Sequence, residues 1–300
     1  MTPEETRGLV DEVRSWPQEE RARRCRQLVE GPSLFDIEVA SACNIVCSFC
    51  PRTSMTRDRA LMDQATFDAV ERFLPSDATV MFSGLGDALL QPRLAEWTGR
   101  LTARGISCCV ITNGVRLVPE KQEELVAAGM AQFQVSVHGL DLETVRSVVP
   151  RGARPQRVKE NLEHLSRRQP SSLRVRLNFV ETDQNAHARA EVEAWAAELG
   201  FEFFHRHEHT RGGSLGLGRH GARTEGCGIY SSVTFIDADG RVLPCVNDVT
   251  GDGTAGSVFE LDWTSVRDWK RRTIQEGSWF SACTQCDDDY RWRILGSMEL

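Results

Sequence analysis

Three cysteines lie close together near the start of the chain, at Cys43, Cys47 and Cys50. Thiolates at this spacing can ligate three irons of a [4Fe-4S] cluster, which leaves the fourth iron open. An open iron can bind a substrate or a cofactor. A partial zinc site or a set of reactive thiols is the alternative interpretation.

A second group of cysteines lies toward the end of the chain, and its members are Cys227, Cys245, Cys283 and Cys286. Four thiolates can ligate every iron of a [4Fe-4S] cluster, so such a cluster would transfer electrons and would not bind substrate. A structural zinc ribbon would use the same four thiolates. Both interpretations remain open from the spacing alone.

The elements around the first cysteines indicate where they lie. Residues 33–40 alternate apolar and polar side chains like a strand, so Cys43 follows the carboxyl end of that strand. Further strands are predicted at 78–82, 107–111, 132–136, 173–180 and 201–209, and helices between them at 63–73, 93–104, 119–129, 155–168 and 186–199. This alternation predicts an α/β fold with a parallel sheet and right-handed crossovers.

Breaks in the pattern divide the chain into three parts. Residues 1–33 are predicted to form a charged helical extension, and residues 34–210 the α/β part. A glycine-rich stretch at 210–218 ends the alternation of strands and helices. Residues 211–300 are predicted to form a small cysteine-rich domain, in which 232–236 and 241–243 flank a hairpin turn.

The run Cys43-Asn44-Ile45-Val46-Cys47-Ser48-Phe49-Cys50 resembles the CxxxCxxC loop of the radical S-adenosylmethionine (SAM) enzymes. The resemblance implies a partial (β/α)6 TIM-like barrel whose active site lies at the carboxyl ends of the strands. It also implies that Cys43, Cys47 and Cys50 hold a [4Fe-4S] cluster, and that SAM chelates this cluster through its amino and carboxylate groups.

The run Ser83-Gly84-Leu85-Gly86-Asp87-Ala88 follows the second predicted strand and resembles the glycine-rich SAM motif of the family. Asp87 and Ala88 replace the usual glutamate and proline, so the charge is kept but its reach is shorter. Further contacts are implied at the ends of later strands. The implied SAM contacts are Phe49, Gly84, Gly86, Asp87, Thr112, Asn113, Ser136 and Asn178.

The second group of cysteines resembles the twitch domain, a shortened relative of the SPASM domain, and this resemblance implies a second, auxiliary [4Fe-4S] cluster. Arg211-Gly212-Gly213, the spacing from Cys227 to Cys245 and the final CxxC are similar to family members such as the 2-deoxy-scyllo-inosamine dehydrogenase of butirosin biosynthesis. The implied reaction oxidises a secondary alcohol of an aminocyclitol or aminoglycoside sugar to a ketone. A 5'-deoxyadenosyl radical takes the hydrogen atom, and the auxiliary cluster takes an electron.

Such an oxidation needs a base near the radical. His205, His207, His209 and Arg211 alternate at the end of the sixth predicted strand, so period-two spacing predicts that they share one face. His207 and His209 are the predicted bases, and a polar edge of the barrel is the alternative. Arg211 matches an active-site arginine of the family and is expected to orient hydroxyls or stabilise an alkoxide, because its reference pKa lies above about 12.

Two other radical SAM reactions remain as alternatives. An epimerase returns a hydrogen atom from a cysteine thiol, but Cys25, Cys108 and Cys109 are interpreted as small buried apolar residues, which favours dehydrogenation. A ribosomal-peptide maturase often carries an amino-terminal winged-helix domain. Residues 1–33 are too short for such a domain.

Composition limits the partners that we expect. A net charge of −7 disfavours nucleic acid as a partner. The sequence contains no run of 18 apolar residues that would indicate a membrane span. Ten cysteines with an acidic amino terminus favour thiolate ligands in the cytoplasm. We therefore expect a cytoplasmic enzyme with a small amino sugar or aminocyclitol as substrate and an external reductant such as flavodoxin or ferredoxin.

Overall fold

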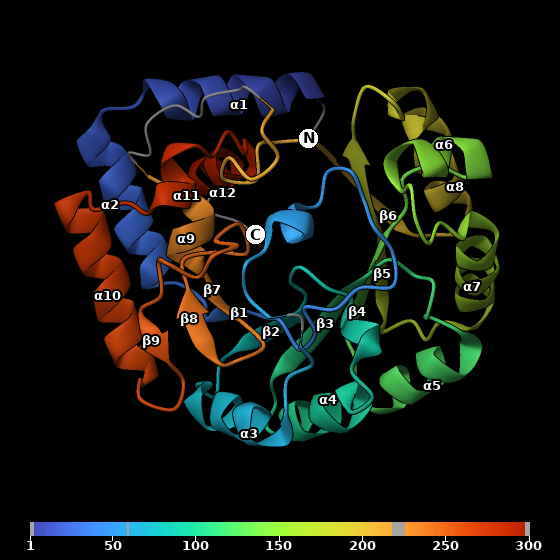
Figure 1. Ribbon diagram of the computed structural model, residues 1–300, viewed down its shortest axis with the longest axis horizontal. Helices are drawn as coiled ribbons and strands as arrows, with labels where there is room; N and C mark the ends of the chain where they lie inside the picture. The colour runs from blue at the N-terminus through green and yellow to red at the C-terminus, as the bar shows by residue number, and fades with distance from the viewer. Residues whose placement is uncertain (1–2, 59, 218–225, 298–300) are drawn as a thin grey trace.

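The structure is a computed structural model that describes residues 3–58, 60–217 and 226–297. Its described strands form one curved sheet in the order β6-β5-β4-β3-β2-β1-β7-β8-β9, with helices around its outer face (Figure 1). The strands are β1 (Leu34–Ile37), β2 (Thr79–Phe82), β3 (Ser107–Thr112), β4 (Gln132–Ser136), β5 (Arg174–Glu181), β6 (Glu202–His207), β7 (Val233–Ile236), β8 (Arg241–Leu243) and β9 (Gly256–Ser257). Strands β1 to β6 are parallel neighbours in chain order, which confirms the predicted α/β fold.

The helices of the barrel alternate with its strands, and several begin where the sequence offers a start signal. The α-helices are α1 (Pro3–Ser15), α2 (Gln18–Val29), α3 (Gln64–Phe73), α4 (Leu94–Ala103), α5 (Pro119–Ala127), α6 (Leu142–Val148), α7 (Pro155–Arg168), α8 (Arg189–Glu198), α9 (Gly228–Ser232), α10 (Trp263–Glu276), α11 (Ser281–Thr284) and α12 (Tyr290–Ser297). Short 3-10 helices are η1 (Pro51–Ser54), η2 (Ala88–Leu90) and η3 (Ala186–Ala188). Asp63 caps α3 by accepting a hydrogen bond from Thr66 N, and Pro155 starts α7.

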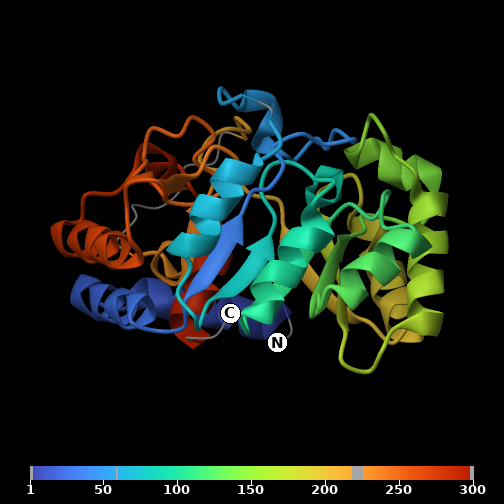
Figure 2. The same cartoon turned by 90° about the horizontal axis from the view of Figure 1, so that it is seen from below.

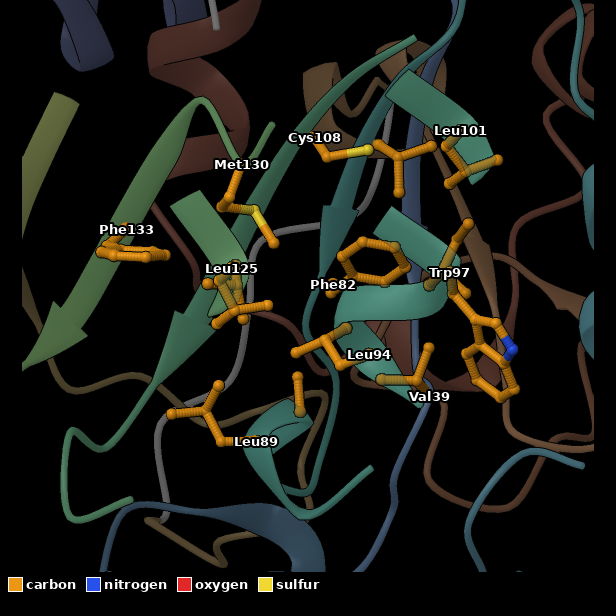
Figure 3. Close-up of a cluster of buried hydrophobic side chains, with 14 of the residues drawn as sticks. Val39, Phe82, Leu89, Leu94, Trp97, Leu101, Cys108, Leu125, Met130 and Phe133 are labelled. Atoms are coloured by element: carbon orange, nitrogen blue, oxygen red, sulfur yellow. The ribbon is translucent and has the colours of Figure 1, made fainter. Parts of the chain in front are cut away.

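The main core lies between the sheet and the barrel helices. Phe82 of β2 packs beside Leu94 and Trp97 of α4, and Cys108 of β3 lies in the same layer (Figure 3). Trp97 stacks on Phe67 of α3 with their ring centroids 4.3 Å apart. Burial of each such side chain stabilises the fold by about 1.5–3 kcal/mol, so this layer holds the strands that carry the site.

The amino-terminal helices pack against the carboxy-terminal part of the chain. Val13 of α1 and Cys25 of α2 share a second core with Tyr230 of α9 and Trp292 of α12, and Figure 1 shows the blue and red helices side by side. Strand β7 pairs in parallel with β1, so the sheet is continuous across the predicted boundary at 210/211. The three-part division stays a prediction, and Gly218 of the predicted boundary stretch lies outside the described residues.

The segment after β1 rises over the carboxyl ends of the first strands, as Figure 2 shows in blue. Backbone hydrogen bonds of 2.9 Å from Val46 N to Arg151 O and from Ser48 N to Val148 O hold it across the barrel mouth. This arrangement places the first cysteines at the barrel's carboxyl edge. Among the described helices, none combines the length and the apolar character that a membrane crossing requires.

Candidate active site

A cavity of about 540 Å³ lies inside the curved sheet. The segment that carries Cys43, Cys47 and Cys50 lines one end of it. Leu34 and Thr79, which begin β1 and β2, line the other end, so the cavity extends along the strands. Cavities of several hundred Å³ hold small-molecule ligands, so this one has room for a cofactor and a small substrate.

The first three cysteines all line this cavity. Burial, together with the thiolates of Cys50 and Cys43, raises the pKa of Cys47 far above its usual range. Thiols that oppose one another's ionisation become thiolates together only beside a positive group, and a metal cluster supplies one. The three thiols and the cavity beside them therefore fit a [4Fe-4S] cluster with one open iron.

Gly84 and Gly86 have no room for a Cβ, because two segments of the chain meet at these positions. A Cβ on Gly86 would lie 2.1 Å from the carbonyl oxygen of Ala40, and a Cβ on Gly84 would lie 2.6 Å from Glu38 Cγ. Gly84 also has a φ of +130°, a conformation that side chains with a Cβ rarely adopt. The glycines thus allow the loop after β2 to lie against the segment that leads into the cysteines.

Asp87 is buried at the same loop and joins two strand ends. Its Oδ2 accepts hydrogen bonds of 2.9 Å from Thr112 Oγ1 and from the backbone N–H of Asn113, and its Oδ1 accepts one of 2.9 Å from Leu89 N. Burial raises its pKa. Both oxygens are engaged within this chain, so Asp87 has a positioning role, and its contact with SAM stays a prediction.

The residues predicted to contact SAM all line this one cavity. Asn113 also reaches the cysteine segment, because its Nδ2 donates to Asn44 Oδ1 at 2.8 Å and lies 3.7 Å from Cys43 Sγ. Asn178 Nδ2 donates to Gln134 Oε1 at 3.2 Å. The structure brings together Phe49, Gly84, Gly86, Asp87, Thr112, Asn113, Ser136 and Asn178.

The second group of cysteines surrounds a small separate cavity, lined by Cys227, Cys245, Cys283 and Cys286. Burial, together with the other three thiolates, raises the pKa of Cys245 well above its usual range. An all-sulfur donor set of this kind fits a metal group, either a [4Fe-4S] cluster or Zn²⁺. Cys245 lines both the small cavity and the large one, so a group held here would adjoin the large cavity.

Arg211 lines the large cavity and is the only non-glycine residue with a positive φ, +51°, in the described part of the chain. Burial and the charge of Arg206 lower its pKa, whereas Asp288 and the thiolates of Cys50 and Cys286 raise it. The guanidinium is therefore within electrostatic reach of cysteines from both groups. A left-handed backbone costs about 1–2 kcal/mol, and here it turns the arginine into the cavity.

The prediction that His205, His207, His209 and Arg211 share one face is wrong. Strand β6 ends at His207, and its alternation directs Phe204 and Arg206 into the cavity, not the histidines. His207 lies on the outer face with 68% of its side chain exposed. Because the chain turns after β6, period-two spacing no longer applies at His209 and Arg211.

His209 is buried behind the cavity wall. Its Nε2 lies 3.2 Å from Arg206 Nη2, and its Nδ1 accepts a hydrogen bond of 3.3 Å from Arg211 N. Burial lowers its pKa to about 2, and the nearby arginines act in the same direction while Asp288 opposes them. Both ring nitrogens are engaged and neither lines the cavity, so the structure does not support His207 or His209 as a base.

Several cavity residues were missed at the level of sequence. Asp36 of β1 lines the cavity and accepts a hydrogen bond from Ser83 Oγ, and burial raises its pKa to about 7. Arg206 pairs with Asp288, whose pKa is raised by burial but lowered further by the charges of Arg206, His209 and Arg211. For Asp36 the available signal was a charged side chain within the otherwise apolar strand β1.

Cys109 also lines the cavity, so its interpretation as a buried apolar residue is wrong. It occupies the alternate position to Cys108, whose side chain points into the core between sheet and helices (Figure 3). Cys25 is fully buried in the second core. Of the three spare thiols, only Cys109 can reach a molecule in the cavity.

Comparison with known proteins gives a family and several relatives. The radical SAM superfamily matches residues 37–188, just over half of the chain. Mycofactocin maturase MftC of Mycolicibacterium smegmatis is 28% identical over 173 residues, 57% of this chain and 43% of that protein. The AdoMet-dependent heme synthase of Methanosarcina barkeri is 30% identical over 122 residues, 39% of this chain and 34% of that protein. The chain thus spans less than half the length of these curated relatives.

Two solved structures share the fold over most of the chain. BtrN in complex with AdoMet and 2-DOIA has a TM-score of 0.58 at 19% identity, covering 86% of this chain and 94% of that one. Streptococcus suis SuiB bound to the precursor peptide SuiA has a TM-score of 0.64 at 16% identity, covering 85% of this chain and 70% of that one. At these identities the likeness establishes the fold alone.

Proposed function

The chain belongs to the radical SAM superfamily, and we propose that it oxidises a secondary alcohol of an aminocyclitol or aminoglycoside sugar to a ketone. Family membership implies SAM and a [4Fe-4S] cluster. Once bound, SAM and this cluster supply a 5'-deoxyadenosyl radical that removes a hydrogen atom, and an auxiliary cluster supplies an electron acceptor. Antibiotic biosynthesis is the setting in which such a product is used.

The chain's own residues divide into two binding sets in this proposal. Cys43, Cys47 and Cys50 hold the SAM-binding cluster, and Cys227, Cys245, Cys283 and Cys286 hold an auxiliary [4Fe-4S] cluster. The cavity residues Phe49, Gly84, Gly86, Asp87, Thr112, Asn113, Ser136 and Asn178 position SAM. Gly84 and Gly86 contribute by allowing backbone approach, and Asp87 by fixing the ends of β2 and β3.

One observation carries the proposal: Cys245 borders both the large cavity and the cavity of the four carboxy-terminal cysteines. An alcohol becomes a ketone by losing one hydrogen atom, one proton and one electron. An oxidant that adjoins the substrate cavity meets the last requirement without an external acceptor. A redox-neutral enzyme has no need of this arrangement.

Removal of the hydroxyl proton and binding of the hydroxyl oxygen require polar groups inside the cavity. Asp36 replaces the two histidines as the candidate base, because it lines the cavity and its pKa of about 7 suits proton acceptance. Arg211 orients the reacting hydroxyl and stabilises an alkoxide. Arg176 lines the cavity as well, and it donates to Gln134 Oε1 at 2.6 Å, so it presents further donors to a polyhydroxylated ring.

The test uses anaerobically purified protein with both cysteine groups loaded with iron and sulfide. The protein receives SAM, a flavodoxin or ferredoxin reducing system and a panel of aminocyclitols and amino sugars, and products are followed by mass spectrometry. We expect a ketone that lacks two hydrogens of its substrate, formed with an equal amount of 5'-deoxyadenosine. Turnover of a precursor peptide in place of every sugar would contradict the proposal.

Redox-neutral epimerisation is a second candidate, because Cys109 presents a thiol to the cavity. In that reaction the thiol returns a hydrogen atom to the opposite face of the substrate radical, and the external reductant restores the thiol. Turnover in deuterated water separates the two reactions. An epimerase yields a product of unchanged composition that carries one solvent deuterium, and Cys109→Ala abolishes this, whereas a dehydrogenase yields the ketone with or without Cys109.

A further inference from the structure

A third group of possible metal ligands lies outside the barrel cavity, at the carboxyl ends of β5 and β6. Glu181 of β5 is the register partner of His207 of β6, and His205 lies two residues earlier on the same outer face. One ligand atom from each residue lies within 4.8 Å of the other two. Alternate residues on one flat strand converge poorly on a single ion. Here the carboxylate from the neighbouring strand adds a ligand from a second direction.

Two distances within this group are close to the edges of a metal coordination sphere. Glu181 Oε2 lies 3.0 Å from His205 Nε2, and Glu181 Oε1 lies 3.5 Å from His207 Nδ1. Ligand atoms at about 2.0–2.2 Å from Zn²⁺ in a tetrahedron lie roughly 3.2–3.6 Å apart. Small side-chain rotations therefore suffice to bring all three onto one ion.

Two of these ligand atoms lack the hydrogen bonds that buried polar atoms normally make. Glu181 Oε2 and His205 Nε2 are both inaccessible to solvent and neither makes a hydrogen bond of proper geometry. Polar atoms buried without well-directed hydrogen bonds are costly, and an ion between these two would engage both.

The charges around the group allow such an ion. Burial lowers the pKa of His205, and although Glu181 opposes this shift, His207 and Arg189 add to it. Arg189 Nε lies 3.1 Å from Glu181 Oε2 and competes for that oxygen. Glu181 Oε1 remains directed toward His207, whose exposed side chain leaves an entry route and room for water.

We propose that Glu181, His205 and His207 bind one divalent transition-metal ion such as Zn²⁺, with solvent completing its coordination. Two imidazoles and one carboxylate are a donor set that Zn²⁺ favours. Arg206 lies between the two histidines in sequence and projects from the opposite face of β6 into the large cavity. The ion fixes the strand end from which Arg206 enters that cavity.

The test measures Zn²⁺ binding to the protein with both cysteine groups already loaded with iron and sulfide, by anaerobic equilibrium dialysis and elemental analysis. We expect one zinc per chain, and an affinity at least tenfold weaker in His207→Ala, whose exposed side chain is not needed for folding. The matched control is His164→Ala on α7, where His164 contacts Gln122, and it should bind zinc like the wild type. Equal binding by wild type and His207→Ala overturns the proposal.

Zinc X-ray absorption on the same samples identifies the ligands. Nitrogen and oxygen neighbours at about 2.0–2.2 Å, with no sulfur at about 2.3 Å, support the assignment. Sulfur neighbours would mean that zinc occupies the cysteines, which overturns it. Because neither readout depends on turnover, this outcome is independent of the proposed alcohol oxidation.

Discussion

The Asp87 carboxylate accepts a hydrogen bond of 2.9 Å from the backbone N–H of Asn113, and so joins the loop after β2 to the end of β3. Asp87→Asn keeps the shape of the side chain but turns part of it into a donor that faces other donors. We expect the free energy of unfolding to fall by about 1–3 kcal/mol and SAM to bind more weakly. Denaturant unfolding and SAM binding measure both effects, and the exposed Asp252→Asn should change neither.

Gly86→Ala tests the close approach of the two loops. The added Cβ would lie 2.1 Å from a backbone carbonyl oxygen, which cannot rotate away, so we expect loss of iron from the first cysteine group and a lower melting temperature. Gly99→Ala in α4 is the control, because nothing lies within 4 Å of its Cβ. An alanine there should stabilise the helix by about 0.5–1 kcal/mol. Equal behaviour of the two variants would refute the steric argument.

Cys43→Ala and Cys283→Ala separate the two cysteine groups. Each should lower the iron content by about four per chain. We expect Cys43→Ala to abolish SAM cleavage, and Cys283→Ala to retain SAM cleavage while losing most ketone formation. Iron analysis and quantification of 5'-deoxyadenosine and ketone measure these effects. If Cys283→Ala lowers cleavage and ketone formation equally, its group is not the electron acceptor.

Asp36 should make stability depend on pH. Its pKa is raised from 3.8 to about 7, mainly by burial, so the folded state holds this proton more tightly than the unfolded state. The stabilisation is complete below about pH 4 and is lost as pH rises to about 7, at about 1.4 kcal/mol per unit. Asp36→Asn should remove this slope, as measured by anaerobic denaturant unfolding across that range. The exposed Asp183→Asn should keep it.

Arg211→Lys tests the arginine that lies near both cysteine groups. Lysine keeps the positive charge but loses the planar fork of donors, so we expect kcat/KM for ketone formation to fall about 10- to 100-fold. SAM cleavage without substrate oxidation should persist, because the cysteines are unchanged. The ratio of 5'-deoxyadenosine to ketone measures this loss of coupling. Arg157→Lys, on the exposed side of α7, should leave the ratio unchanged, and an unchanged ratio in Arg211→Lys would argue against the assigned role.

Helices and strands whose ends or period are set by neighbouring residues were predictable from the sequence. Helix α7 begins and ends at the predicted residues because Pro155 favours a helix start and the apolar residues recur with helical period. Strand β4 matches its predicted range as well. The first cysteine group was found from its spacing, since ligand spacing within a loop is a property of neighbouring residues.

Features that depend on distant contacts were not predictable in this way. The pairing of β7 with β1, and the core shared by Cys25 and Tyr230, join segments about two hundred residues apart. The cavity position of Cys109 depends on which face of β3 the neighbouring helices cover. No local pattern distinguishes that face from the other when both carry cysteine.

The sequence by itself determined the strand and helix alternation, the two cysteine groups and the residues at the strand ends. The tertiary structure alone decided which side chains enter the cavity. His209 illustrates the reason: alternation assigns it a face only while the strand continues, and β6 ends at His207, where packing against Asp288 and Arg206 takes over. Side-chain direction beyond a strand end follows from packing between distant segments, which residue spacing does not encode.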